Sequence, residues 1–102
     1  VFVEVRGPLG ADLSGWRIQG IEGSGASAGF ANLESFVFPA GTLIGSNGRN
    51  VFVVADGTGT SATLTSVPNA DFIVPDMDLE NGPDAVHLLD AGGLLVDALA
   101  YG

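Results

Sequence analysis

The chain has 102 residues, enough for one domain around one hydrophobic core, and its net charge of −9 argues against nucleic acid as a direct partner because phosphate binding needs Lys and Arg. It contains no cysteine, which excludes disulfides and thiolate metal sites. No apolar run reaches the ~18 residues of a membrane span. Sixteen glycines and five prolines favour turns and strands over helices, which we expect to be nearly absent.

The first strands are predicted near the start of the chain. Residues 1–6 alternate between valine and larger or charged residues, so that the valines lie on one face and Phe2, Glu4 and Arg6 on the other. This pattern is typical of a half-buried strand. A second strand is expected over residues 14–21, with Trp16 as the central core residue because an indole buries a large apolar surface. We expect the core around Trp16 to include four aliphatic residues: Val51, Val53, Val86 and Leu88.

The next stretch predicts a loop and two short strands. Residues 22–34 are mostly small, so they cannot bury enough apolar surface to become well ordered, and we expect a mobile loop. Short strands are predicted at residues 36–38 and 42–44. Pro39 restricts the junction between them to a sheet edge or a bend.

The second half of the chain carries the strongest strand signals. Residues 50–55 are apolar on both faces, which predicts a central strand covered on both sides. A weak edge strand is expected at residues 63–65 and a short strand at residues 72–74. Residues 85–89 and 94–98, separated by a glycine-containing turn, predict a hairpin. Seven to nine short strands without helical periodicity indicate an all-β sandwich or barrel.

Several blocks, in this order and spacing, resemble a known family, the lamin-tail domain. The family is an immunoglobulin-like β-sandwich found at the end of nuclear lamins and in bacterial and archaeal multidomain proteins. The resemblance covers nearly the whole chain and rests on residues 12–18 (DLSGWRI), 38–44 (FPAGTLI), 51–55 (VFVVA), 79–90 (LENGPDAVHLLD) and 93–97 (GLLVD), and on Tyr101.

The resemblance implies that residues 1–102 form a single immunoglobulin-like domain of two antiparallel sheets. Prokaryotic members look like accessory modules of secreted or surface hydrolases, nucleases and adhesion proteins. A non-catalytic role, an extracellular or cell-surface location and a protein or cell-surface partner are therefore implied by analogy of fold. Because the sequence opens inside a predicted strand, we also expect it to be part of a larger protein.

Catalytic motifs are weak. Residues 25–29 match the G-x-S-x-G pattern around Ser27, but a nucleophile elbow needs a strand before the serine, a helix after it and a histidine partner. His87 is the only histidine, and we expect it to be an exposed histidine on a strand rather than a catalytic or metal-binding residue. The three arginines, at positions 6, 17 and 49, are scattered and form no anion clamp. We therefore expect no enzymatic activity.

One cluster of oxygen-bearing side chains lies in the second half of the chain: Asp71, Asp76, Asp78, Glu80, Asn81 and Asp84. Calcium binds six or more oxygens, and acids at alternate positions can direct several toward one point. The spacing lacks the turn glycine and closing glutamate of an EF-hand, whose positions hold Asn81 and His87. A weak calcium site is therefore considered against a solvated acidic loop, with the ligands Asp76, Asp78, Glu80 and Asp84.

These observations predict a non-catalytic protein-interaction or attachment module of a larger extracytoplasmic protein, monomeric as an isolated domain, with no cofactor other than weak calcium. Two alternatives come from other classes. One is a calcium- or carbohydrate-binding accessory module of a secreted hydrolase or nuclease, although Trp16 and Tyr101 look structural rather than like a sugar platform. The other is a small hydrolase domain, for which the sequence lacks a nucleophile, base and orienting acid.

Overall fold

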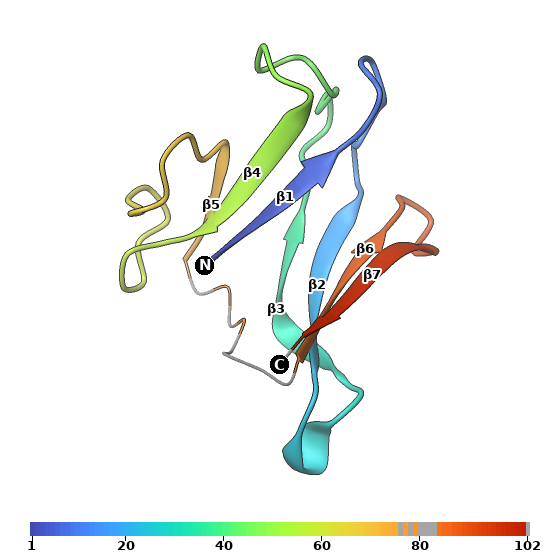
Figure 1. Cartoon of the computed structure of the whole chain (residues 1–102), viewed down its shortest axis with the longest axis vertical. Helices are drawn as coiled ribbons and strands as arrows, with labels where there is room; N and C mark the ends of the chain where they lie inside the picture. Colours follow the sequence, from blue (N-terminus) through green and yellow to red (C-terminus); the bar gives the residue numbers. More distant parts are fainter. Residues whose placement is uncertain (76, 78, 80–83, 102) are drawn as a thin grey trace. The chain divides into compact units, whose positions relative to one another are not determined.

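A computed structural model describes residues 1–75, 77, 79 and 84–101, with the backbone alone at 32–34. Figure 1 shows the described chain as strands joined by loops. Seven strands and one short 3-10 turn, η1 (Gly25–Ser27), occur in these residues, so the all-β prediction is confirmed. The strands are β1 (Phe2–Arg6), β2 (Arg17–Glu22), β3 (Ala31–Val37), β4 (Val51–Asp56), β5 (Phe72–Val74), β6 (Asp84–Leu89) and β7 (Leu95–Tyr101).

The chain folds into two compact units with one sheet each. The first unit comprises Val1–Leu13 and Gly41–Met77, and the second comprises Ser14–Ala40 and Asp78–Gly102. Each unit is therefore built from two separate stretches of sequence. The immunoglobulin-like arrangement of the two sheets stays a prediction. Within the described part of the chain, no helix has the length and hydrophobicity needed to cross a lipid bilayer.

The first sheet has the strand order β1-β4-β5, with β4 in the centre. The four middle residues of β4, Phe52 through Ala55, are all buried, which confirms the prediction of a central strand covered on both faces. β1 pairs with β4 antiparallel, but β5 pairs with β4 parallel. The prediction of purely antiparallel sheets is therefore wrong here, because the long connection over residues 57–71 lets the chain re-enter the sheet in the direction of β4.

The second sheet is antiparallel throughout, with the order β3-β2-β6-β7. The predicted hairpin is confirmed as β6 and β7. Its turn is closed by the Asp90 N–H, which donates to the Leu94 carbonyl (2.9 Å), and by the Gly93 N–H, which donates to the Asp90 carbonyl (3.0 Å). Gly93 has a φ of 84°, which a side chain would disfavour. This geometry fits a three-residue hairpin loop with a glycine bulge.

The small-residue segment is more ordered than its composition predicts. Instead of a loop over residues 22–34, η1 is followed by β3, which starts at Ala31. Backbone pairing supplies the order that side chains cannot: the Glu22 N–H donates to the Phe30 carbonyl (3.0 Å) and the Gly29 N–H to the Glu22 carbonyl (2.7 Å). These bonds continue the pairing of β2 with β3 toward the turn.

Two predicted strands are not formed. Residues 42–44 contribute one isolated bridge, between Leu43 and Asp12. At residues 63–65 the Ser61 hydroxyl accepts the backbone N–H groups of Thr63 (3.1 Å) and Leu64 (2.9 Å), which folds the chain into a local turn. A serine that bonds its own neighbours competes with a strand ladder, and here the local bonds prevail.

The centre of the core is not Trp16. Trp16 precedes β2 and is only partly buried, whereas Phe38 (1% exposed) and Val54 (0% exposed) are the largest fully buried side chains. The Phe38 backbone extends the pairing beyond β3: its N–H donates to the Trp16 carbonyl (2.8 Å), and its carbonyl accepts from the Gly15 N–H (3.0 Å). Of the other predicted core residues Val53 is buried, while Val51, Val86 and Leu88 are partly buried.

Replacing Gly57 with alanine should destabilise the first unit. Gly57 follows β4, and a Cβ added to it would collide with the backbone carbonyl oxygen of Ser61. Backbone cannot move aside as a flexible side chain can, so we expect a loss of about 1–3 kcal/mol in the free energy of unfolding, measured by urea denaturation. Gly7→Ala is the matched control, because a Cβ there meets Ile44 at an ordinary 3.6 Å. Equal losses in both variants would contradict the steric explanation.

Candidate functional site

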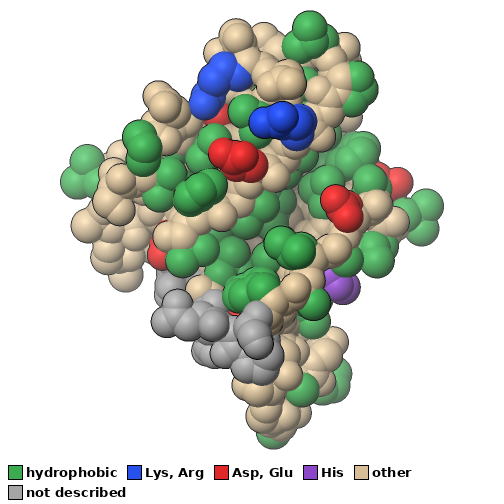
Figure 2. All heavy atoms as spheres, in the orientation of Figure 1, with side chains coloured by type: hydrophobic (Ala, Val, Ile, Leu, Met, Phe, Trp, Pro, Cys, Tyr) green, Lys and Arg blue, Asp and Glu red, His purple; other side chains and the backbone are tan. Residues whose placement is uncertain are grey.

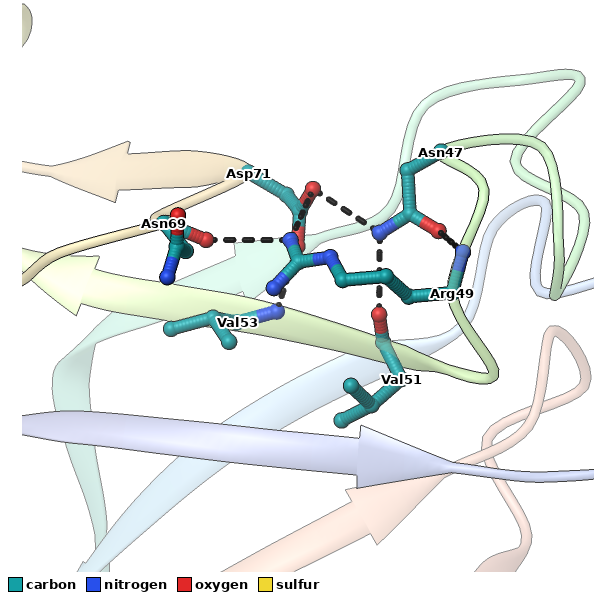
Figure 3. Close-up of polar contacts among 6 residues, drawn as sticks. All are labelled: Asn47, Arg49, Val51, Val53, Asn69 and Asp71. Carbon is teal, nitrogen blue, oxygen red and sulfur yellow. Dashed lines mark hydrogen bonds and ion pairs between the residues drawn. The ribbon is translucent and has the colours of Figure 1, made fainter.

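A polar cluster around Asp71 lies at the edge of the first sheet (Figure 3). Asp71 directly precedes β5, and its carboxylate accepts hydrogen bonds from the Asn47 side chain (2.9 Å), the backbone N–H of Val53 (2.8 Å) and the Arg49 guanidinium, whose Nη2 contacts both oxygens at 2.9 and 2.8 Å. We call these residues, with Val51 and Asn69, the Asp71 cluster.

The rest of the Asp71 cluster joins two loops to β4. The Asn47 side chain also donates to the Val51 carbonyl (2.9 Å), and its oxygen accepts the Arg49 backbone N–H (3.0 Å). Arg49 in addition donates to the Asn69 carbonyl (3.0 Å). Both oxygens of Asp71 are engaged by these donors, so this carboxylate serves as a structural clamp. Sequence reasoning grouped Asp71 with the acidic loop and treated Arg49 as an isolated charge; the structure pairs them.

The Asp71 carboxyl has a pKa below its ordinary value of 3.8. Burial on its own raises this pKa, but the hydrogen bonds from Asn47, Val53 and Arg49, together with the arginine charge, outweigh burial and lower it. A carboxyl whose pKa is lower in the folded than in the unfolded state stabilises the fold fully above the unfolded pKa. That stabilisation is lost as the pH falls through the lower, folded value.

Acid should therefore reveal the role of Asp71. Between neutral pH and about pH 4 the stabilising effect of the carboxylate stays constant, and below about pH 4 it declines. We expect the free energy of unfolding of the wild type to fall more steeply with acid than that of Asp71→Asn, which has no proton to bind. Urea denaturation at a series of pH values from 7 to 2 measures both slopes. Parallel slopes would show that Asp71 titrates alike in the folded and unfolded chain.

The predicted calcium ligands fall mainly outside the described residues. Asp76, Asp78 and Glu80 are among the residues that the structure does not describe. Asp84 begins β6, is 4% exposed and accepts a hydrogen bond from the Gly23 N–H (3.1 Å), which ties β6 to the segment after β2. In the described ranges no three His, Asp or Glu side chains gather closely enough to hold a metal ion. The calcium site stays a prediction.

Ser27 and His87 belong to different parts of the second unit. Ser27 ends η1 in the exposed connection between β2 and β3, so an antiparallel strand follows it where a nucleophile elbow has a helix. His87 lies in the middle of β6, paired with Gln19 on one side and Ala98 on the other, and is partly buried. It is therefore less exposed than the sequence predicted.

An exposed apolar surface occurs on and beside β7, and sequence reasoning did not identify it. Every residue of β7 except Tyr101 is exposed. Figure 2 shows hydrophobic side chains projecting on the side of the view where Figure 1 places the β6–β7 hairpin. We define the β7 surface as four large apolar side chains with their exposed fractions: Leu94 (71%), Leu95 (55%), Val96 (51%) and Leu99 (65%). Apolar residues on both faces of a strand ordinarily predict burial, which is why the sequence signal was misleading.

The backbone of β7 presents hydrogen-bonding groups away from β6. The Asp90 N–H bonds to the Leu94 carbonyl, so Asp90 faces β7, and alternation along β6 makes Leu88 and Val86 face β7 as well. His87 then faces β2. Ala98, which lies opposite His87, therefore directs its N–H and carbonyl toward the outer edge of the sheet, as does Ala100.

Asp97 covers one of these outward groups. Its carboxylate accepts the N–H of the adjacent Ala98 at 2.9 Å. The register of the hairpin also shifts between Leu88 and Leu89, which leaves Val96 as an extra residue in β7. A bulge and a charged side chain are two devices by which proteins interrupt an exposed sheet edge. The edge that remains regular runs from Asp97 to Tyr101.

The chain matches no family model, and none of the curated proteins matches it either. The resemblance to lamin-tail domains therefore stays a prediction drawn from the sequence blocks.

Proposed function

We propose that this chain is a non-catalytic protein-interaction or attachment module, and that the β7 surface is its binding surface. The observation that carries the proposal is the exposure of four large apolar side chains on one edge of a sheet, at Leu94, Leu95, Val96 and Leu99. Exposed large apolar side chains cost solvation free energy, and where they gather on soluble proteins they typically mark interaction sites.

The resemblance to lamin-tail domains supports the same class of function and adds that the module acts outside the cytoplasm, as part of a larger protein. The chain's net charge of −9 favours a protein partner over a nucleic acid, because phosphate binding needs Lys and Arg and the chain has three arginines and no lysine. A protein partner can use apolar contacts, which the β7 surface offers.

A peptide-display selection against the chain tests this function. We expect enriched peptides whose affinity falls by at least ~10-fold in the double variant Leu95→Ser with Leu99→Ser, as expected when two apolar anchors are removed from an interface. The matched control is Leu9→Ser with Leu64→Ser, which removes two leucines of similar exposure, 75% and 67%, from the first unit.

The melting temperature of both double variants should stay close to that of the wild type, because exposed side chains add little stability. Selection of no peptide, or selection of peptides that bind both double variants equally well, would contradict the proposal.

A further inference from the structure

We propose that the β7 edge binds its partner by strand addition, and that the partner segment is an extended, basic stretch of another protein. The added strand runs antiparallel to β7 along Asp97 to Tyr101, with an apolar residue opposite Leu99 and a lysine or arginine opposite Asp97. This inference rests on the proposed function, since it names the partner chemistry of the same surface.

The backbone argument comes from the outward groups of Ala98 and Ala100. An edge strand with unpaired N–H and carbonyl groups is a template for an extended segment, which gains main-chain hydrogen bonds along its length. β7 has a neighbouring strand on the β6 side alone among the described residues. The bulge at Val96 breaks the edge, so a regular ladder begins only at Asp97.

The side chains specify the added strand. Asp97 and Leu99 are two residues apart and therefore lie on the same face of β7. In an antiparallel pair, directly opposed side chains are about 4.5–5.5 Å apart at their Cβ atoms, and opposite charges or apolar pairs there are favourable. The complementary sequence, read from its N-terminus, is an apolar residue, any residue, and then a basic residue.

The charge of the chain selects against a second copy of itself. Each copy carries a net charge of −9, so the association of two copies works against electrostatic repulsion between them. A basic segment meets no such repulsion and is attracted by the net negative charge of the chain.

Asp97 also acts as a cover for the edge before the partner arrives. Its carboxylate accepts the Ala98 N–H at 2.9 Å, so this donor is satisfied in the unbound chain. When the side chain of a basic residue binds the carboxylate, the Ala98 N–H becomes available to the carbonyl of the added strand. A neutral or acidic strand has no side chain that can draw the Asp97 carboxylate away from the Ala98 N–H. The Asp97–Ala98 hydrogen bond therefore favours basic partners.

The test uses an acetylated and amidated peptide that alternates threonine with valine and carries one lysine two residues after a valine. Titration of the isotope-labelled chain should shift the amide resonances of Ala98 and Ala100 and slow their hydrogen exchange. The same peptide with glutamate in place of lysine should bind much more weakly. Added salt should weaken the binding of the lysine peptide.

Variants separate the backbone from the charge. Ala98→Pro removes the outward N–H and is tolerated on the outer side of an edge strand, so binding should weaken more than about tenfold while the fold is kept. If this variant does not fold, a peptide N-methylated at its edge-facing nitrogens tests the same bonds on the wild type. Asp97→Asn should weaken binding about two- to five-fold, the range of exposed ion pairs. Glu4→Gln, which removes one charge from β1, should leave it unchanged.

Two results would overturn strand addition while leaving the proposed function intact. The first is a selected peptide whose binding requires Leu95 and Leu99 but is as tight to Ala98→Pro as to the wild type. The same conclusion follows if methylation of the peptide's edge-facing nitrogens leaves its affinity for the wild type unchanged. The second is failure of the lysine peptide to outbind the glutamate peptide. Self-association of the chain through β7, detected by sedimentation and abolished by Ala98→Pro, would overturn the choice of a basic partner over a second copy.

Discussion

Replacing Phe38 with alanine should lower the free energy of unfolding by about 3–5 kcal/mol, the range for a buried phenylalanine. Phe38 is 1% exposed and packs edge-on against Phe36, with ring centroids 5.0 Å apart. Truncation removes both the aromatic contact and the buried surface, and the surrounding residues can fill the cavity only in part. Urea denaturation followed by tryptophan fluorescence and by circular dichroism measures the loss.

Trp16→Ala is the informative comparison for Phe38→Ala. Trp16 is larger, and the sequence predicted it as the centre of the core, but it is partly exposed. We therefore expect a smaller loss for Trp16→Ala than for Phe38→Ala. The reverse order would place the centre of the core at the indole, as the sequence alone suggested. Circular dichroism must report this comparison, because the variant lacks the fluorophore.

The second large effect is expected at Asp71. Asp71→Ala should cost about 2–4 kcal/mol, because the N–H of the buried Val53 loses its acceptor and the Asn47 and Arg49 side chains each lose one of two acceptors. We also expect the loops that carry Asn47, Arg49 and Asn69 to become less ordered, because the Asp71 cluster holds them against β4. Thermal unfolding gives the stability, and amide exchange at Val53 reports the local opening.

Arg49→Ala separates the ion pair from the rest of the Asp71 cluster. The Arg49 side chain is 36% exposed, against 13% for Asp71, so solvent screens the charge and the aspartate keeps two other donors. The loss should stay at or below about 1 kcal/mol. A loss as large as that of Asp71→Ala would mean that the ion pair, and not the hydrogen bond to Val53, dominates the cluster.

Local patterns predicted the elements whose signals are local. The β6–β7 hairpin follows from two apolar runs around a turn that ends in Gly93, and β4 follows from a run of apolar residues on both faces. β5 was expected as a strand, but its parallel pairing with β4 depends on the path of the whole connection over residues 57–71. The course of this connection in space cannot be inferred from the residues near β5.

The candidate sites show the same division. Asp71 and Arg49 are 22 positions apart, so nothing in their immediate neighbours indicates that they meet. The exposure of β7 could not be predicted either, because Leu95, Val96 and Leu99 have the pattern of a buried strand. Whether the side chains of such a strand are buried depends on what packs against the two faces of the sheet, which is a tertiary property.

The assembly of each unit from two separated stretches also affects how the protein is made. During synthesis β1 emerges before its partner β4, with β2 and β3 between them in the sequence. β2 and β3 can pair early, but the first unit and the β6 side of β2 must wait for later sequence. Contacts between distant residues slow folding and prolong the exposure of apolar strands. The apolar strands β1 and β2 are therefore expected to stay partly exposed in the nascent chain until β4 and β6 have emerged.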